Sequence, residues 1–200
     1  MNILLFDSSI KYSDKIKFND LVIILGPLQH VINTSYINIP QTIKSTCMKN
    51  YIQNNEITVI CNNITIFEKY AIPINNKFKL SIIYLKVDNY HVFATYYIQV
   101  HSKILFNLQN DILYNLIETL SIPHTDYIII AGKFGYSFHE NPAEISSLCN
   151  KFHCNIPRIN NEDISILDKF ILIKKNYKSI CNDINYSNNI CIYNSQKKMK

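Results

Sequence analysis

The chain has 200 residues, of which 20 are basic and 15 acidic, so its formal net charge is +5. A hydrophobic share of 48% is too high for a disordered chain, and the length suits one domain that buries about two-thirds of its unfolded surface. Three glycines are too few for a glycine-rich phosphate loop, and the charge is weaker than that of most nucleic-acid-binding domains.

The first elements in chain order are two short apolar strands. We expect the first at Asn2–Phe6 and the second at Asp20–Leu25. Because the second run is continuously apolar after its first residue, it is predicted to lie in a sheet that is covered on both faces. Gly26 and the proline after it end this strand.

The middle of the chain is predicted to be rich in strands. A polar stretch with one helical turn at Lys44–Tyr51 is expected first. Glu56–Cys61 and Asn63–Phe67 follow as two short β-type runs, which predict a hairpin or a bulge. Lys79–Val87 and His91–Val100 then predict the best-defined hairpin of the sequence.

The period of the apolar residues changes in the second half of the chain. Apolar residues recur every three or four positions over Ile104–Leu120, which predicts an amphipathic helix. Tyr127–Ala131 is typical of a buried strand, and Pro142–Phe152 is expected to form a short helix capped by Asn141. The last predicted strands are Ile166–Lys174 and Asn189–Tyr193.

These elements predict one α/β domain over residues 1–195, followed by a basic tail at 196–200. The six cysteines show no paired C-x-x-C spacing, and Cys61 and Cys191 lie inside apolar runs, as core thiols usually do. The start of the chain lacks a signal-peptide pattern, and no apolar run reaches about 18 residues. We therefore expect free thiols in a reducing compartment, the cytoplasm with the nucleus as the alternative, and no membrane contact.

The order of the elements resembles the endonuclease/exonuclease/phosphatase superfamily, whose fold is DNase I-like. In that family a second strand similar to D-I-V-x-L-Q-E is followed by a strand ending in G-D-F-N, an I-D-x-I strand and a terminal S-D-H. The most specific match here runs from Asp126 to Gly135, and Leu167–Leu172 follows at a fitting distance. The resemblance covers nearly the whole chain and implies an α/β fold, a reduced two-layer β-sandwich flanked by helices.

Most catalytic positions of the family carry other residues in this chain. The metal-binding Glu aligns with Gly26, and the Asp and Asn of G-D-F-N align with Lys133 and Gly135. The acid and the imidazole of S-D-H are replaced by Asn188 and Asn189. In the family the opening strand ends in Asn, and this position aligns with Asp7 or Ser8. The catalytic His that follows the long hairpin aligns with His101 or Gln99. The Asp of the I-D-x-I strand aligns with Asp168, which alone is clearly retained.

The resemblance implies hydrolysis of phosphate esters, in which a divalent cation takes carboxylate ligands and an Asp activates water. The ammonium group of Lys133 cannot accept a proton, and Gly26 offers no ligand. We therefore expect a catalytically inactive homologue of a metal-dependent nuclease or phosphatase, without a metal or other cofactor, that serves as a structural or interaction protein with a protein partner. The 37 Ile and 26 Asn are typical of AT-rich genomes, such as those of large cytoplasmic DNA viruses.

Two alternatives stay open at this point. One is an active Mg²⁺-dependent endonuclease or phosphodiesterase whose displaced site gathers acids around His101 or His139. The other is a nucleic-acid-binding module that has lost cleavage, in which Lys133, Lys174 and Lys175 line one groove.

Two further groups of residues have structural explanations. Cys149, His153 and Cys154 are close in sequence but lack a nearby fourth zinc ligand, so a buried Cys149 on a helix that ends near His153 is the preferred interpretation. Tyr96 and Tyr97 are suited to stacking on bases. Because neighbouring residues of a strand point to opposite faces, we expect one of these rings inside and the other outside.

Overall fold

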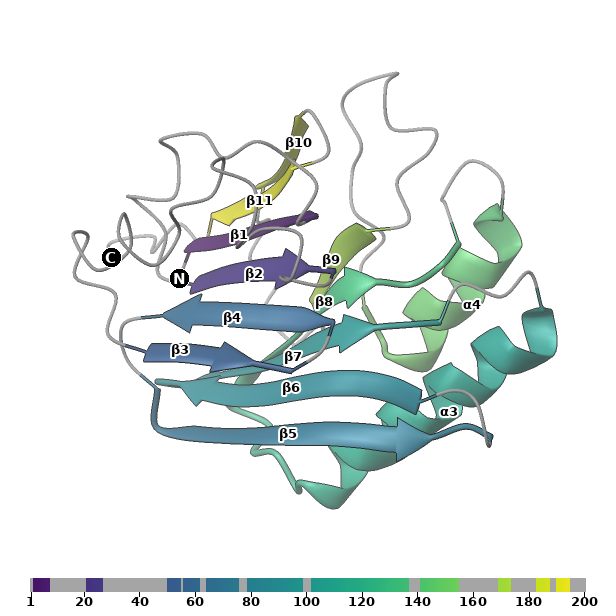
Figure 1. Ribbon diagram of the computed structural model, residues 1–200, viewed down its shortest axis with the longest axis horizontal. Coiled ribbons are helices and arrows are strands. Elements are labelled where there is room, and N and C mark those ends of the chain that lie inside the picture. The colour runs from purple at the N-terminus through teal and green to yellow at the C-terminus, as the bar shows by residue number, and fades with distance from the viewer. Residues whose placement is uncertain are drawn as a thin grey trace.

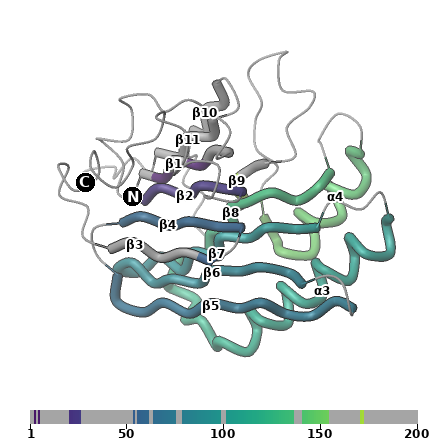
Figure 2. Tube along the Cα trace, in the orientation of Figure 1, coloured from purple at the N-terminus to yellow at the C-terminus, as the bar shows by residue number. Residues whose placement is uncertain are grey.

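The computed structural model shows two facing β-sheets, with helices packed on one of them (Figure 1). Figure 2 follows the same arrangement along the Cα trace. The described residues are 2–7, 21–26, 50–54, 56–61, 64–75, 79–98, 102–136, 141–154, 169–173, 183–187 and 190–194.

The first sheet has a parallel pair of strands at its centre. β1 and β2 run parallel, with Ile3 opposite Leu21 and Asp7 opposite Leu25. All other neighbours in this sheet pair antiparallel. The strand order is β10 (Asp183–Ser187), β11 (Ile190–Asn194), β1 (Asn2–Asp7), β2 (Leu21–Leu25), β4 (Ile57–Cys61) and β3 (Asn50–Gln53).

The second sheet is built around a hairpin and a parallel crossover. β6 and β7 are joined by the turn residues Asp88 and Asn89, with Val87 opposite Tyr90. β7 and β8 run parallel, and the chain returns between them through a helix, as parallel pairing requires. The strand order is β5 (Ile66–Pro73), β6 (Lys79–Val87), β7 (Tyr90–Tyr96), β8 (Tyr127–Lys133) and β9 (Lys169–Ile173).

The described helices are α3 (Lys103–Thr119) and α4 (Pro142–Lys151), and they pack on the second sheet (Figure 1). The Ser102 hydroxyl caps α3 by accepting a hydrogen bond from the Leu105 N–H at 3.4 Å. Pro142 begins α4 as predicted, whereas Asn141 occupies the cap position without a side-chain capping bond. Neither of these helices is long and apolar enough to cross a lipid bilayer.

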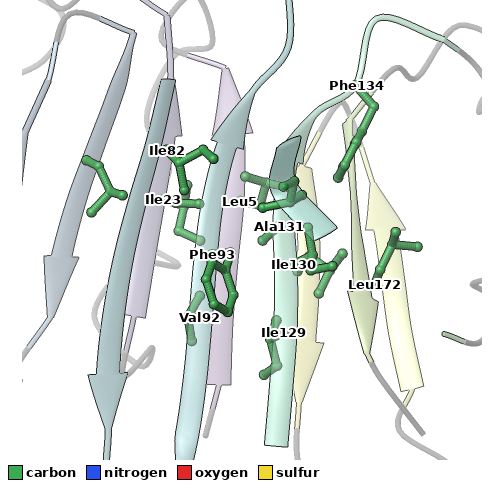
Figure 3. Close-up of a cluster of buried hydrophobic side chains, with 14 of the residues drawn as sticks. Leu5, Ile23, Ile82, Val92, Phe93, Ile129, Ile130, Ala131, Phe134 and Leu172 are labelled. Carbon is green, nitrogen blue, oxygen red and sulfur yellow. The ribbon is translucent and has the colours of Figure 1, made fainter. Parts of the chain in front are cut away.

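The apolar core lies between the sheets and beneath the helices. β4 packs against β6 and β7, β2 against β8, and β1 against β9. Figure 3 shows Leu5 and Ile23 of the first sheet and Ile129 and Ala131 of the second within one cluster of buried side chains. Every residue of β2 is buried, which confirms a strand covered on both faces. Each large aliphatic side chain so buried stabilises the fold by about 1.5–3 kcal/mol relative to exposure.

Alternate residues of β6 and β7 face the two layers. The Ser81 hydroxyl donates to the Glu56 carboxylate of the first sheet at 2.5 Å, so Ser81 faces the inter-sheet core. Because Ser81 pairs with Tyr96, the Tyr96 side chain points to the same side. Tyr84 and His91 belong to the alternate set and face the helices.

Most predicted elements are confirmed, and two assignments are corrected. The amphipathic helix is α3, and the best-defined hairpin is β6 with β7. The predicted pairing of Glu56–Cys61 with Asn63–Phe67 is wrong, because β4 joins the first sheet and β5 pairs with β6 in the second. Part of the predicted helical turn at Lys44–Tyr51 is instead strand, since β3 begins at Asn50 and pairs with β4.

Candidate functional site

Two of the positions that the sequence resemblance singled out lie on facing sheets at one end of the sandwich. β2 is followed by Gly26, and β8 ends at Lys133. The two strands pack against each other and point in the same direction in Figure 1. This region, defined by Gly26 and Lys133, is called the Lys133 end below.

Gly26 adopts a backbone conformation that suits glycine. Its φ is 107°, and its N–H donates to the Glu56 carbonyl oxygen at 2.7 Å. A residue with a Cβ is strained in this region of φ/ψ space. The position therefore lacks a carboxylate, and its backbone also disfavours one.

Glu56 is the acidic residue beside Gly26. The Asn54 side-chain oxygen accepts hydrogen bonds from the N–H groups of Glu56 at 3.1 Å and of Ile57 at 2.7 Å, which fixes the turn before β4. The Glu56 carboxylate then accepts the bond from Ser81 across the two sheets. This carboxylate joins the two layers at the Lys133 end.

Sequence reasoning missed Glu56 as a site residue, together with Asn54 and Ser81. A signal was present, because an antiparallel pairing of β4 with β2 places Glu56 beside Gly26. That pairing could not be chosen from the sequence while β4 was expected to pair with the following run. The cross-sheet partner Ser81 depends on how the sheets stack, for which the local sequence gives no signal.

Lys133 lies in a row of residues that crosses the second sheet. Its Cα pairs with Tyr96 on one side and with Lys169 on the other. The Lys133 ammonium group is 5.7 Å from the centre of the Tyr96 ring, within the range of a cation–π contact. Tyr97 is fully buried on the helix side of the sheet, and the half-buried Tyr96 ring packs against the core on the opposite side. The two rings therefore point to opposite faces as predicted, but neither lies outside. On β6 the row continues to Ser81, which pairs with Tyr96.

Gly135 follows the same strand with a φ of 74°, again in the region that favours glycine. Asp7 ends β1 opposite Leu25, so its backbone also reaches the Lys133 end. In the described ranges, no three His, Cys, Asp or Glu side chains come together as a metal site. The positions His101, His139, Asp168, Lys174, Lys175, Asn188 and Asn189, with the tail at 196–200, lie outside the described residues.

Cys149 is buried on α4 and His153 lies just after the helix, as predicted. Cys149 is buried, and burial raises the pKa of its thiol to about 11, so the thiol keeps its proton at neutral pH. His153 is exposed just after the helix, where its φ is 52°. A protonated thiol is a poor nucleophile and a poor metal ligand, which argues against thiol chemistry at Cys149.

No protein-family profile and no curated protein matches the chain in sequence. Solved structures do match in three dimensions. A humanized D. rerio TDP2 with 14 mutations has 8% identity and a TM-score of 0.61, over 98% of this chain and 99% of that chain. Beta toxin from Staphylococcus aureus has 12% identity and a TM-score of 0.62, over 98% and 100%. Sphingomyelinase C from Streptomyces griseocarneus has 11% identity and a TM-score of 0.62, over 96% of this chain and 98% of that chain. At such identities the likeness establishes the fold alone.

Proposed function

We propose that this chain, which has a DNase I-like fold, is a catalytically inactive homologue of metal-dependent nucleases and phosphatases that acts as a structural or interaction protein. The observation that carries the proposal is Lys133 at the end of β8, with its ammonium group over the Tyr96 ring. The resemblance places a water-activating Asp at that position. Lys133 can neither take a proton from water nor bind a cation at neutral pH.

The physical argument extends to the metal position. A divalent cation needs several oxygen ligands, and an ammonium group nearby repels it. Gly26 supplies no side chain, and its φ of 107° opposes replacement by Glu. Loss of a single stabilising donor typically costs about 2.7–4 kcal/mol of transition-state stabilisation, so combined losses remove the mechanism.

Similar structures show which chemistry the fold accommodates elsewhere. One is a beta toxin variant from Staphylococcus aureus with bound magnesium ions. Another is D. rerio TDP2 in complex with single-strand DNA product. The proposal is that the present chain keeps this fold and carries Lys133 where the resemblance places a catalytic carboxylate.

An activity assay tests this proposal. The purified full chain is incubated with plasmid, abasic duplex and a generic phosphatase substrate in Mg²⁺ or Mn²⁺. We expect no turnover above that of an EDTA-treated sample. Turnover that is lost with EDTA and in Asp168→Ala, but kept in the exposed control Glu118→Gln, establishes the active alternative and rejects the proposal.

The pair of Tyr96 and Lys133 at the end of the second sheet also favours a second candidate, a nucleic-acid-binding module without cleavage. Aromatic rings stack on bases, and lysines neutralise phosphates. Fluorescence anisotropy with a single-stranded oligonucleotide over a salt series tests it. Binding that weakens with salt, with a slope lowered by about one in Lys133→Ala, supports the module. Equal binding by Lys133→Ala and by the α4 control Lys151→Ala rejects it.

A further inference from the structure

A chain of polar side chains lies on the helix side of the second sheet, near the β6–β7 turn and the start of β8. Tyr84 and His91 are each only 4% exposed. The Tyr84 oxygen is 2.9 Å from Nδ1 of His91, and Nε2 of His91 is 2.9 Å from the Asp126 carboxylate. Both ring nitrogens are therefore occupied by protein groups, which leaves proton uptake as the chemistry open to this histidine.

The chain of polar groups continues into the edge strand β5. Glu68 is the Cα partner of Tyr84, so the two side chains stand next to each other on one face of the sheet. The Tyr70 hydroxyl also donates to the Glu68 carboxylate. Burial raises the pKa of Tyr84, and the Glu68 and Asp126 carboxylates raise it further, so this phenol keeps its proton. Tyr84 thus has one proton, an acceptor in His91, and the Glu68 carboxylate on the adjacent strand.

The charged groups around His91 come from three directions. β5 contributes Glu68, and the segment before β8 contributes Asp126 and the exposed His124. β6 contributes Lys86, whose ammonium group is 3.5 Å from the Asp126 carboxylate. On β8 the neighbour of His91 is Ile128, and the buried side chains of α3 include no titratable group. A positive charge on the His91 ring would face a carboxylate directly at Asp126 and another beyond Tyr84.

We propose that the Tyr84 hydroxyl is a proton-driven hydrogen-bond switch that donates to neutral His91 and turns to Glu68 when His91 takes up a proton. In the neutral ring, Nε2 carries the hydrogen and donates to Asp126, while Nδ1 accepts from Tyr84. After protonation, Nδ1 becomes a donor to the Tyr84 oxygen, and the phenolic hydrogen needs another acceptor. Glu68 supplies it, so acid adds a hydrogen bond that ties β5 to the β6–β7 hairpin.

Two NMR measurements on the full chain test the switch. The ring ¹⁵N shifts of His91 report its tautomer and its charge, and amide hydrogen exchange reports the protection of β5. In the neutral ring we expect the Nε2–H tautomer. Once acid makes the ring ¹⁵N shifts report a charged His91, the protection factors of the β5 amides bonded to β6 should rise about tenfold, the effect of one hydrogen bond to a charged group.

The variants separate this switch from a general effect of pH. Tyr84→Phe keeps the ring but removes the hydroxyl, and it should abolish the rise in protection. Tyr70→Phe is the matched control, because it removes a hydroxyl from β5 and leaves Glu68 in place, so the rise should persist. If Tyr84→Phe does not fold, Glu68→Ala takes its place. A neutral Nδ1–H tautomer, a ring charged throughout the range, or an unchanged rise in Tyr84→Phe overturns the proposal.

Discussion

Gly132 is required by the close approach of two strands at a single residue. A Cβ added there would lie 2.0 Å from the Thr95 carbonyl oxygen and 2.5 Å from the Thr95 hydroxyl. The neighbouring backbone cannot yield without loss of the β7–β8 pairing, so Gly132→Ala should lower the free energy of unfolding by about 1–3 kcal/mol. Urea denaturation measures this. Gly135→Ala is the comparison, because its positive φ of 74° alone should cost about 1–2 kcal/mol. Unchanged stability of Gly132→Ala contradicts the clash.

Asp126 makes the stability of the fold depend on pH. Its hydrogen bond from His91 lowers the pKa of the carboxyl below its usual 3.8, and Lys86 and Thr125 lower it further, while burial opposes them. A carboxyl whose pKa is lower in the folded state stabilises the fold above its unfolded pKa, and that contribution is lost as the pH falls through the folded pKa. Asp126→Asn should therefore cost about 1–2 kcal/mol at neutral pH and much less near pH 2.

Denaturant titrations of wild type and Asp126→Asn at several pH values measure this difference. Asp88→Asn serves as the control, because it removes an exposed carboxylate from the nearby turn. A difference between wild type and Asp126→Asn that stays constant from neutral to strongly acid solution shows that the carboxylate contributes no pH-dependent stability.

At the scale of elements, β4 and β6 each carry a buried hydroxyl, and removal of the two hydroxyls should change stability in opposite directions. Ser81 donates to Glu56 across the two sheets, and its loss leaves a partly buried carboxylate without this bond. Ser81→Ala should destabilise by about 1.5–3 kcal/mol. The Thr58 hydroxyl on β4 is buried and has no hydrogen-bond partner among the described residues. Thr58→Val keeps the shape and should stabilise by about 1 kcal/mol. Urea denaturation measures the free energy of unfolding of both variants. A change of the same sign in Ser81→Ala and Thr58→Val contradicts this account.

The elements that the sequence predicted best are those whose pattern is local. The three- and four-residue period of α3 and the continuous apolar run of β2 are visible in single segments. The partner of β5 was not visible, because its sequence predicts a strand but not the sheet that the strand joins. β3 was missed because its four residues become a strand only by bonding to β4.

The candidate site shows the same division between local and long-range signals. The sequence was sufficient to place Gly26 and Lys133 at strand ends, because each directly follows or ends an apolar run. The contact of Glu56 with Ser81 joins different sheets across 25 positions, and that of His91 with Asp126 spans 35. Contacts of this kind depend on register and sheet stacking, which one unaligned sequence does not determine.

At the scale of the whole molecule, Lys133 is separate from the apolar residues that stabilise the sandwich. Ile129 is fully buried between the sheets, whereas Lys133 is half-buried where β8 ends. Ile129→Ala should therefore cost about 2–5 kcal/mol. Lys133→Asp loses the cation–π contact with Tyr96, which is worth about 0.5–1 kcal/mol, and should leave the fold intact.

The same Lys133→Asp variant relates stability to chemistry. Under the proposed function, it supplies a carboxylate at the end of β8, while the position that the resemblance assigns to a metal ligand still carries Gly26 with its φ of 107°. We therefore expect folded protein by circular dichroism and no EDTA-sensitive turnover in Mg²⁺, since a base without a bound cation lacks the charge stabilisation that phosphate esters require. If Lys133→Asp gains metal-dependent activity, the remaining ligands are in place and Lys133 alone blocks catalysis. If it unfolds while Ile129→Ala does not, Lys133 is part of what stabilises the sandwich.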